Sequence, residues 1–204
     1  MSKSNVVLTI PEPKKFELVE KPFPKIKAGY AIVKNDYAGV CLEGSRIWTK
    51  HEFEKFFGGG QSDYPDGLGH ESVGVVDEVM PGSNFKPGDR VLANGSGLSE
   101  TRDGGYSEYL RLPDDCVVPL PDGLSFREAM SIGTAGFSAA MSLWRMEQNG
   151  QHPGQGPVLV SGATGGVGSI AIDLLSGRGY TVAALTGKPG AAAYLERLGA
   201  SRVL

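Results

Sequence analysis

The stretch Val158-Leu-Val-Ser-Gly-Ala-Thr-Gly-Gly-Val-Gly168 decides the fold of the second half of this 204-residue chain. Its first three residues are a short apolar run, typical of a buried parallel strand, and a helical pattern follows over 165–176. A strand, a glycine turn and a helix in this order direct unpaired backbone N–H groups and the positive helix end at one point. The pattern predicts that a dinucleotide diphosphate binds here, the candidate residues being Gly162, Ala163, Thr164, Gly165, Gly166, Val167 and Gly168.

The residues at the end of the next predicted strand indicate whether NAD(H) or NADP(H) would bind. An NAD site usually places Asp or Glu about 20 residues after the glycine turn, where it accepts from the ribose 2′-OH. This chain instead has Thr186, Gly187 and Lys188. A hydroxyl and a cation suit a 2′-phosphate, so these residues favour NADPH over NADH. The alternative is that Lys188 is a solvated residue at the entrance to a helix and that specificity is set elsewhere.

The chain changes its pattern near residue 125. Before it, short β-type runs alternate with Pro/Gly turns, which predicts an irregular antiparallel barrel or sandwich. Ser125-Phe-Arg-Glu128 reads as a capping box that opens a helix to about Glu147, with a possible interruption at 133–136. The predicted strands are Val6–Leu8, Phe16–Val19, Tyr30–Lys34, Val73–Val79, Arg90–Ala93, Tyr106–Leu112 and Cys116–Leu120, and after the glycine turn we expect strand Tyr180–Leu185, helix Pro189–Leu198 and a third strand at Arg202.

Composition excludes several classes of protein. The formal net charge is −3 with scattered Lys and Arg, so the chain lacks the basic face that nucleic acid binding needs. The N-terminus has no secretory apolar region, and the longest uncharged stretch is rich in Gly, Ser, Gln and Pro, which argues against a membrane span. Two cysteines do not make a disulfide framework. We expect a reduced, cytoplasmic protein that acts on a small-molecule substrate.

From about Gly95 onward the chain resembles the medium-chain dehydrogenase/reductase superfamily, in its quinone-oxidoreductase and acryloyl-CoA reductase branch. The resemblance rests on Gly104-Gly105, Ile132-Gly-Thr-Ala-Gly-Phe-Ser138, the glycine turn and Tyr194–Leu204. It implies an α/β protein with an all-β part: a GroES-like barrel at 1–124, then an incomplete Rossmann doubly wound parallel sheet at 125–204. It also implies that Thr134 contacts the cofactor, and it agrees with NADPH.

The first half is similar to the zinc-dependent alcohol dehydrogenases, through Ala38-Gly-Val-Cys41 and Gly69-His70-Glu71. There the matching Cys and His bind catalytic zinc with the Glu beside it, so the resemblance implies Cys41, His70 and Glu71 as metal and catalytic candidates. Three departures stand against zinc: Ala135 replaces the second metal Cys, Met80 stands where a small residue is expected, and the four-cysteine lobe is missing. Glu43 replaces the usual proton-relay Ser or Thr and could complete a metal site. The alternative is that His70 and Glu71 begin a strand and Cys41 is a small core residue.

A Rossmann sheet has more strands than this chain supplies, so we expect the N-terminal portion of a longer, homodimeric enzyme that binds cofactor poorly when isolated. Three functions stay open. The first is a zinc-independent NADPH reductase of an activated C=C or carbonyl substrate, of enone, quinone or acryloyl-CoA type. The second is a zinc-dependent alcohol dehydrogenase. The third is a dinucleotide-binding fragment without turnover.

Overall fold

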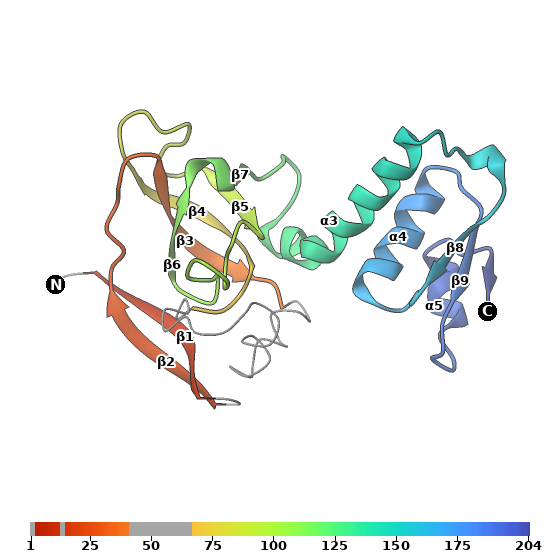
Figure 1. The fold of residues 1–204 in the computed structure, drawn as a ribbon, viewed down its shortest axis with the longest axis horizontal. Helices are drawn as coiled ribbons and strands as arrows, with labels where there is room; N and C mark the ends of the chain where they lie inside the picture. Colours follow the sequence, from red (N-terminus) through yellow and green to blue (C-terminus); the bar gives the residue numbers. More distant parts are fainter. Residues whose placement is uncertain (1–2, 13–14, 41–66) are drawn as a thin grey trace. The chain divides into compact units, whose positions relative to one another are not determined.

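The computed structural model describes residues 3–12, 15–40 and 67–204. The chain forms two compact units, Met1–Gly133 and Thr134–Leu204 (Figure 1). The regular elements of the first unit are mostly β-strands, and those of the second are helices and a parallel sheet, which confirms the predicted α/β class with an all-β part. Among the described residues, no helix is both long and apolar enough to span a membrane.

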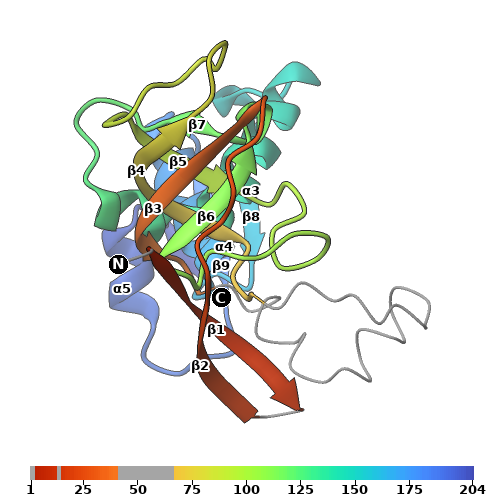
Figure 2. The same cartoon turned by 90° about the vertical axis from the view of Figure 1, so that its left-hand side faces the viewer.

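The first unit contains a five-stranded antiparallel sheet in the order β6-β3-β4-β5-β7 and a separate hairpin, β1-β2 (Figure 2). Alternating buried residues of the larger sheet, among them Val33, Val76, Val91 and Leu110, form its main core. The strands are β1 (Ser4–Glu12), β2 (Lys15–Pro22), β3 (Tyr30–Ala38), β4 (Glu71–Val79), β5 (Arg90–Asn94), β6 (Tyr109–Pro113) and β7 (Val118–Pro119), with the 3-10 helix η1 (Asp114–Cys116) between the last two.

Two predicted strands of this unit are shorter than expected. The strand expected from Tyr106 starts only at Tyr109, because the backbone of Tyr106 bonds outside the sheet, to Leu68 O and Leu8 N. The strand expected over Cys116–Leu120 is reduced to β7, since Cys116 belongs to η1. Both predictions were wrong because other hydrogen bonds took backbone groups that the apolar pattern had assigned to a ladder: tertiary bonds at Tyr106, and the local bond from Val117 N–H to Asp114 O at η1.

Helix α3 (Phe126–Gln148) begins with the predicted capping box. The Ser125 hydroxyl and backbone N–H both donate to Glu128 Oε2, at 2.6 and 2.8 Å, and the Glu128 N–H donates back to Ser125 Oγ at 3.2 Å. Gly133, with φ +45° and ψ −153°, kinks the helix within the segment where an interruption was expected. The first helical turns pack Ala129 against Val73 and so extend the first unit past residue 125, although the assignment of domains as 1–124 and 125–204 stays a prediction.

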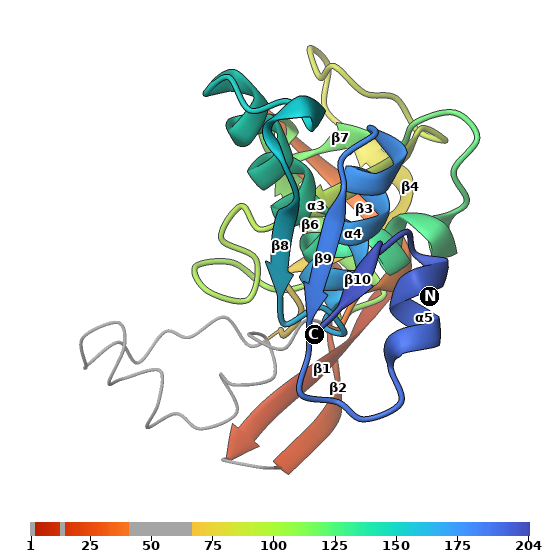
Figure 3. The ribbon, with the colours of Figure 1, turned by 90° about the vertical axis from the view of Figure 1, so that its right-hand side faces the viewer.

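The second unit holds a three-stranded parallel sheet in the order β10-β9-β8, which is the 3-2-1 part of a doubly wound sheet (Figure 3). Ile172, Leu175 and Leu195 are buried against Val182 and Ala184 of the sheet. The elements are the 3-10 helix η2 (Pro153–Gln155), β8 (Val158–Ser161), α4 (Gly166–Gly177), β9 (Val182–Leu185), α5 (Ala192–Arg197) and β10 (Arg202–Val203).

One helix of this unit differs from its prediction. Helix α5 was expected to begin at Pro189 but begins at Ala192, because Pro189 and Gly190 form a turn in which Gly190 has φ +77°. Gly199 follows the end of α5 with φ +103°, as expected of a glycine that ends a helix. Lys188 therefore does not lie at a helix entrance.

Candidate functional site

In the glycine turn between β8 and α4, the backbone at the end of β8 lies in close contact with the backbone of the first turn of α4. The Gly165 N–H donates to Gly162 O at 2.9 Å, and Gly162 has φ +60°. A Cβ atom on Gly168 would lie 2.5 Å from Gly162 O and 2.9 Å from Ala163 Cα. Only glycine at 168 therefore lets the first turn of α4 lie against the end of β8, the role that the sequence pattern predicts for it.

The outer side of this turn is open to solvent. Gly165 and Gly166 are exposed, as is Val167 at 46%. The first helical bond of α4 runs from Ser169 N–H to Gly165 O, and no side chain caps the helix. The amides of residues 166–168 precede that bond, so they have no partner within the helix and can donate to an anion.

Ala163 and Thr164 have different positions in the turn. Ala163 is fully buried in the core, and its N–H donates to Leu185 O at 3.1 Å. Thr164 Oγ1 lies 3.3 Å from Thr186 Oγ1. Because the carboxyl ends of the parallel strands β8 and β9 meet at one edge, the turn and the predicted specificity residues lie together.

Two further predicted cofactor residues belong to that neighbourhood. Lys188 is exposed, and its backbone N–H donates to Thr186 Oγ1 at 3.2 Å, so the hydroxyl shapes the backbone that carries the cation. Thr134 precedes Ala135, whose Cβ lies 3.1 Å from the point that a Cβ on Gly166 would occupy. Thr134 is thus next in sequence to a residue at the glycine turn.

In the first unit, the described metal candidates lie at the start of β4. Glu71 is 4% exposed, and its carboxylate fills the space left by two glycines: Gly39, where a Cβ would collide with Oε1, and Gly133, where a Cβ would lie 2.7 Å from Oε2. No spacing pattern relates these three positions, so the role of both glycines could not be recognised in the sequence. His70 Nε2 is buried and has no hydrogen-bond partner among the described residues.

The Gly104-Gly105 pair holds this strand start in place. Gly104, Gly105 and Tyr106 donate their N–H groups to the carbonyls of Gly67, Gly69 and Leu68 at 2.7–3.0 Å. A Cβ on Gly105 would lie 2.8 Å from Glu71 O, so the two segments can cross only without a side chain there.

These donors do not form a metal centre within the described ranges. Nowhere in residues 3–12, 15–40 and 67–204 do three His, Cys, Asp or Glu side chains gather closely enough to hold a metal ion. Cys41 and Glu43 lie outside the described residues. An imidazole nitrogen without a partner and a nearby carboxylate are donor types that zinc accepts, but they are two donors where catalytic zinc uses three protein ligands.

Comparison with known proteins agrees with both halves of the chain. Residues 27–122 match the profile of the alcohol dehydrogenase GroES-like domain. The chain is 53% identical over 143 residues to a putative quinone oxidoreductase, YhfP, from Bacillus subtilis, covering 70% of the chain and 43% of that protein. It is 46% identical over 147 residues to the acrylyl-CoA reductase AcuI of Ruegeria pomeroyi, covering 72% and 44%.

Two solved structures resemble the fold over its whole length. The yhdH oxidoreductase from Salmonella enterica in complex with NADP is 33% identical, with a TM-score of 0.80 over 98% of this chain and 60% of that one. Bacillus subtilis yhfP with NAD bound is 39% identical, with a TM-score of 0.84 over 100% and 60%. The chain spans less than half the length of the two curated relatives and about 60% of the solved chains. With its GroES-like domain, its strand–glycine turn–helix and these relatives, the chain belongs to the medium-chain dehydrogenase/reductase superfamily.

Proposed function

We propose that this chain is the cofactor-binding part of an NAD(P)H-dependent oxidoreductase. The observation that carries the proposal is the tight turn made by the contact of Gly168 with Gly162, which places the exposed residues Gly166 and Val167 at the start of α4 and leaves the amides of 166–168 without a partner within the helix. Those amides would donate to the diphosphate, whose negative charge the positive helix end stabilises. Ala163 would shape the turn from the core, and Thr134, next in sequence to Ala135, would contact the cofactor.

Within this proposal we favour NADPH. A carboxylate at the end of β9 would repel a 2′-phosphate, whereas Thr186 and Lys188 offer a hydroxyl and a cation. One similar structure was solved with NADP and another with NAD. In this chain the local charge supports the phosphorylated cofactor.

The reaction we propose is the reduction of an activated C=C bond. Two of the curated relatives are described as a quinone oxidoreductase and an acrylyl-CoA reductase. When bound, the reduced nicotinamide supplies a hydride, and the β-carbon of an enone, quinone or acryloyl thioester would accept it. For an enone or acryloyl thioester, a proton added at the α-carbon would complete the saturated product, whereas a quinone would end as its hydroquinone with protons on both oxygens. The hydride transfer itself leaves the cofactor oxidised. We also expect the enzyme to be cytoplasmic and homodimeric.

The test of cofactor binding is a titration with NADPH, followed by its fluorescence, on the wild-type chain and two variants. Gly166→Asp places a carboxylate beside the proposed diphosphate position and should weaken binding by at least about tenfold. Gly177→Asp makes the same change at the other end of α4, where a Cβ meets nothing within 4 Å, and should bind as wild type. Equal affinities of the two variants would contradict the proposal.

A zinc-dependent alcohol dehydrogenase is the second candidate, favoured by the buried His70 Nε2 without a described partner and by the Glu71 carboxylate. His70, Glu71 and Cys41 would hold the metal, which would polarise an alcohol or carbonyl oxygen. Zinc in the purified protein, lost in Cys41→Ser and His70→Ala together with alcohol oxidation, would support this candidate. Enone reduction that survives both substitutions in zinc-free protein would exclude it. Tight NADPH binding without turnover on either substrate class would favour the dinucleotide-binding fragment.

A further inference from the structure

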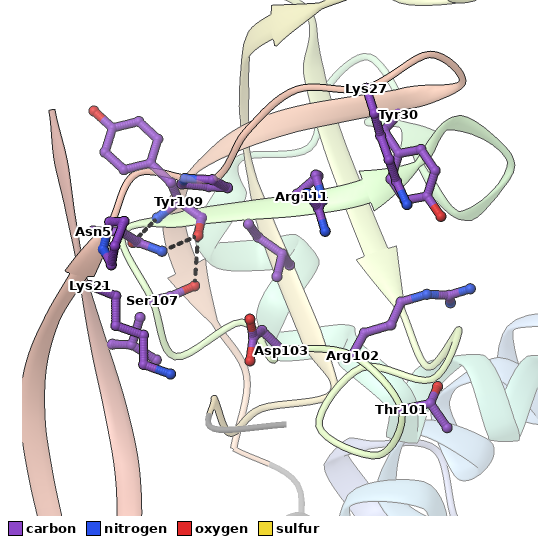
Figure 4. A pocket seen from close by; sticks show the side chains of 14 residues that line it. Asn5, Lys21, Lys27, Tyr30, Thr101, Arg102, Asp103, Ser107, Tyr109 and Arg111 are labelled. Atoms are coloured by element: carbon purple, nitrogen blue, oxygen red, sulfur yellow. Dashed lines mark hydrogen bonds between the residues drawn. The ribbon is translucent and has the colours of Figure 1, made fainter. Parts of the chain in front are cut away.

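A cavity of about 520 Å³ lies in the first unit, beside the β1-β2 hairpin and strand β6 (Figure 4). Its lining residues come from 5–30 and 101–111, so every one of them belongs to the first unit. The volume falls within the range of small-molecule sites in proteins. The predicted catalytic and cofactor residues do not line it.

The lining carries an excess of positive charge. Apart from Lys21, which has a partner of its own, the charged residues of the lining are Lys27, Arg102 and Arg111 and a single carboxylate, Asp103, whose Oδ1 accepts the Gly67 N–H at 3.3 Å. In the described part of the chain, no carboxylate lies within salt-bridge distance of Lys27, Arg102 or Arg111.

Some cations elsewhere in the described part of the chain are paired with carboxylates, whereas others, such as Lys34 and Arg127, are not. Lys3 lies 2.8 Å from Asp77, and Arg178 lies 2.6 Å from Glu147. Lys27 and Arg111 are exposed and Arg102 is half-buried, so these three cations are distinguished by lining one concavity in which no described carboxylate pairs with them. A concavity lined by charges of one sign favours a ligand of the opposite sign.

Neutral groups hold these cations in position. Arg102 is half-buried and donates to the carbonyl of Ser96 and, at 3.8 Å, to Cys116 Sγ. Arg111 donates to Lys25 O at 3.0 Å. Carbonyl and thiol partners orient a guanidinium without cancelling its charge, and each arginine keeps further N–H donors.

Tyr30 brings two of the cations together. Lys27 Nζ lies 3.9 Å from the centre of the Tyr30 ring, and Arg111 Cζ lies 5.7 Å from the same point. Figure 4 shows Lys27 and Tyr30 at the upper right of the cavity, Arg111 beside them toward the centre, and Arg102 below them.

The loop that carries Arg102 is closely constrained. Gly95, Ser96, Gly97 and Ser99 all have positive φ, between 53° and 77°. The Arg102 N–H donates to Gly97 O at 3.0 Å, and its carbonyl accepts from Ser99 N–H at 2.8 Å. Non-glycine residues at positive φ cost free energy, so the surrounding contacts must hold this loop in its shape. The position of Arg102 is thereby set in advance of any ligand.

We propose that this cavity binds a phosphorylated small molecule, with the phosphate between Lys27, Arg102 and Arg111. The planar guanidinium fork matches phosphate geometry, and a doubly charged phosphate neutralises more of the three cations than a single carboxylate does. An extended nucleic acid is a poorer match, because the chain has net charge −3 and this basic group lines a concavity.

The test is a 1H–15N NMR titration of the full chain with inorganic pyrophosphate at low ionic strength. We expect saturable shifts of the amides of Arg102, Asp103 and Arg111, and an affinity that falls with salt. Arg111→Gln and Lys27→Gln, both at exposed side chains, should each lower the affinity by about tenfold. The matched controls Arg127→Gln and Lys34→Gln remove the same charges outside the cavity and should change nothing.

Pyrophosphate could also bind the glycine turn, so Gly166→Asp is titrated in parallel. Shifts at residues 101–111 that persist in this variant support the cavity site even if the proposed cofactor site fails. Shifts confined to 162–168, or shifts at 101–111 that Arg111→Gln leaves unchanged, overturn the proposal. Phenyl phosphate then separates two sources of the anion: tighter binding than inorganic phosphate indicates an ester, and equal binding indicates the free ion.

Discussion

Lys188 and Thr186 form the most accessible specificity element in the proposed cofactor site. The cation is exposed, and its backbone N–H is tied to the Thr186 hydroxyl at 3.2 Å. The hydroxyl is in turn 3.3 Å from Thr164 Oγ1, so the residues proposed to select the ribose are connected to the turn that would hold the diphosphate. A change of charge here is expected to alter the choice of cofactor and leave the fold intact.

Lys188→Glu should reverse the preference for NADPH. A carboxylate repels the 2′-phosphate and can accept from a free 2′-OH, so the ratio of the NADH to the NADPH dissociation constant should fall by about tenfold or more. Fluorescence titration with each cofactor measures the ratio. Arg197→Glu, the same change of charge on the exposed face of α5, is the control and should leave the ratio unchanged. An unchanged ratio in Lys188→Glu would show that specificity is set elsewhere.

Helix α3 depends on two features near its start, the capping box and the kink at Gly133. The kink has a positive φ and, in addition, the Glu71 carboxylate occupies the space beside it. Glycine at this position therefore allows the positive φ of the kink and also leaves room for the buried Glu71 carboxylate.

Gly133→Ala should reduce the free energy of unfolding by more than about 1 kcal/mol, because alanine is strained at positive φ and its Cβ meets Glu71. Denaturant unfolding followed by circular dichroism measures the loss. Gly123→Ala is the matched control, since Gly123 has φ +89° but nothing within 4 Å of a Cβ. The amount by which Gly133→Ala lowers the free energy of unfolding more than Gly123→Ala does measures the contact with Glu71. Equal losses of free energy in the two variants would show that this carboxylate moves away freely.

The capping box makes the start of α3 sensitive to acid. The Ser125 hydroxyl, and then the Ser125 N–H, lower the pKa of Glu128 below its ordinary value of 4.5. The folded state therefore favours the ionised carboxylate, so its contribution to stability is present above pH 4.5 and is lost as pH falls through the lowered pKa. The protection factors of the amides at residues 125–129 against hydrogen exchange should fall over that range in wild type. Glu128→Gln should show no such step, and a step that persists in the variant would assign the change to another group.

At the level of the complete chain, two compact units carry two different candidate sites. The glycine turn and Thr186–Lys188 belong to the second unit, and the cationic cavity belongs to the first. A ligand that binds one of these sites should stabilise the backbone around that site most strongly.

Hydrogen exchange with mass spectrometry can test this on the intact chain. NADPH at concentrations well above its dissociation constant should slow exchange in peptides that cover 162–168 and 186–188. Pyrophosphate, added to Gly166→Asp, should slow exchange in peptides that cover 101–111. Protection by NADPH that is strongest at 101–111 would contradict the assignment of the glycine turn as the dinucleotide site.

Local patterns allowed much of this architecture to be predicted. The strand–glycine turn–helix at 158–177, the capping box at Ser125 and the third strand at Arg202 all formed where expected, because each depends on backbone rules within a few residues. The start of α5 was placed too early, since proline at a helix start and proline in a turn look alike without the conformation of Gly190.

Features built from distant residues could not be read in the same way. Gly39 and Gly133 enclose the Glu71 carboxylate, and Lys27, Arg102 and Arg111 share one cavity, although long stretches of chain separate them. A pattern along the chain reports the hydrogen bonds and periodicity of neighbouring residues, and it carries no distance between residues that only strand pairing and loop crossing bring together. The glycine turn can therefore be recognised in the sequence alone. The surroundings of Glu71 and the cationic cavity form only once β3, β4 and β6 have paired and the 95–106 loop has crossed them.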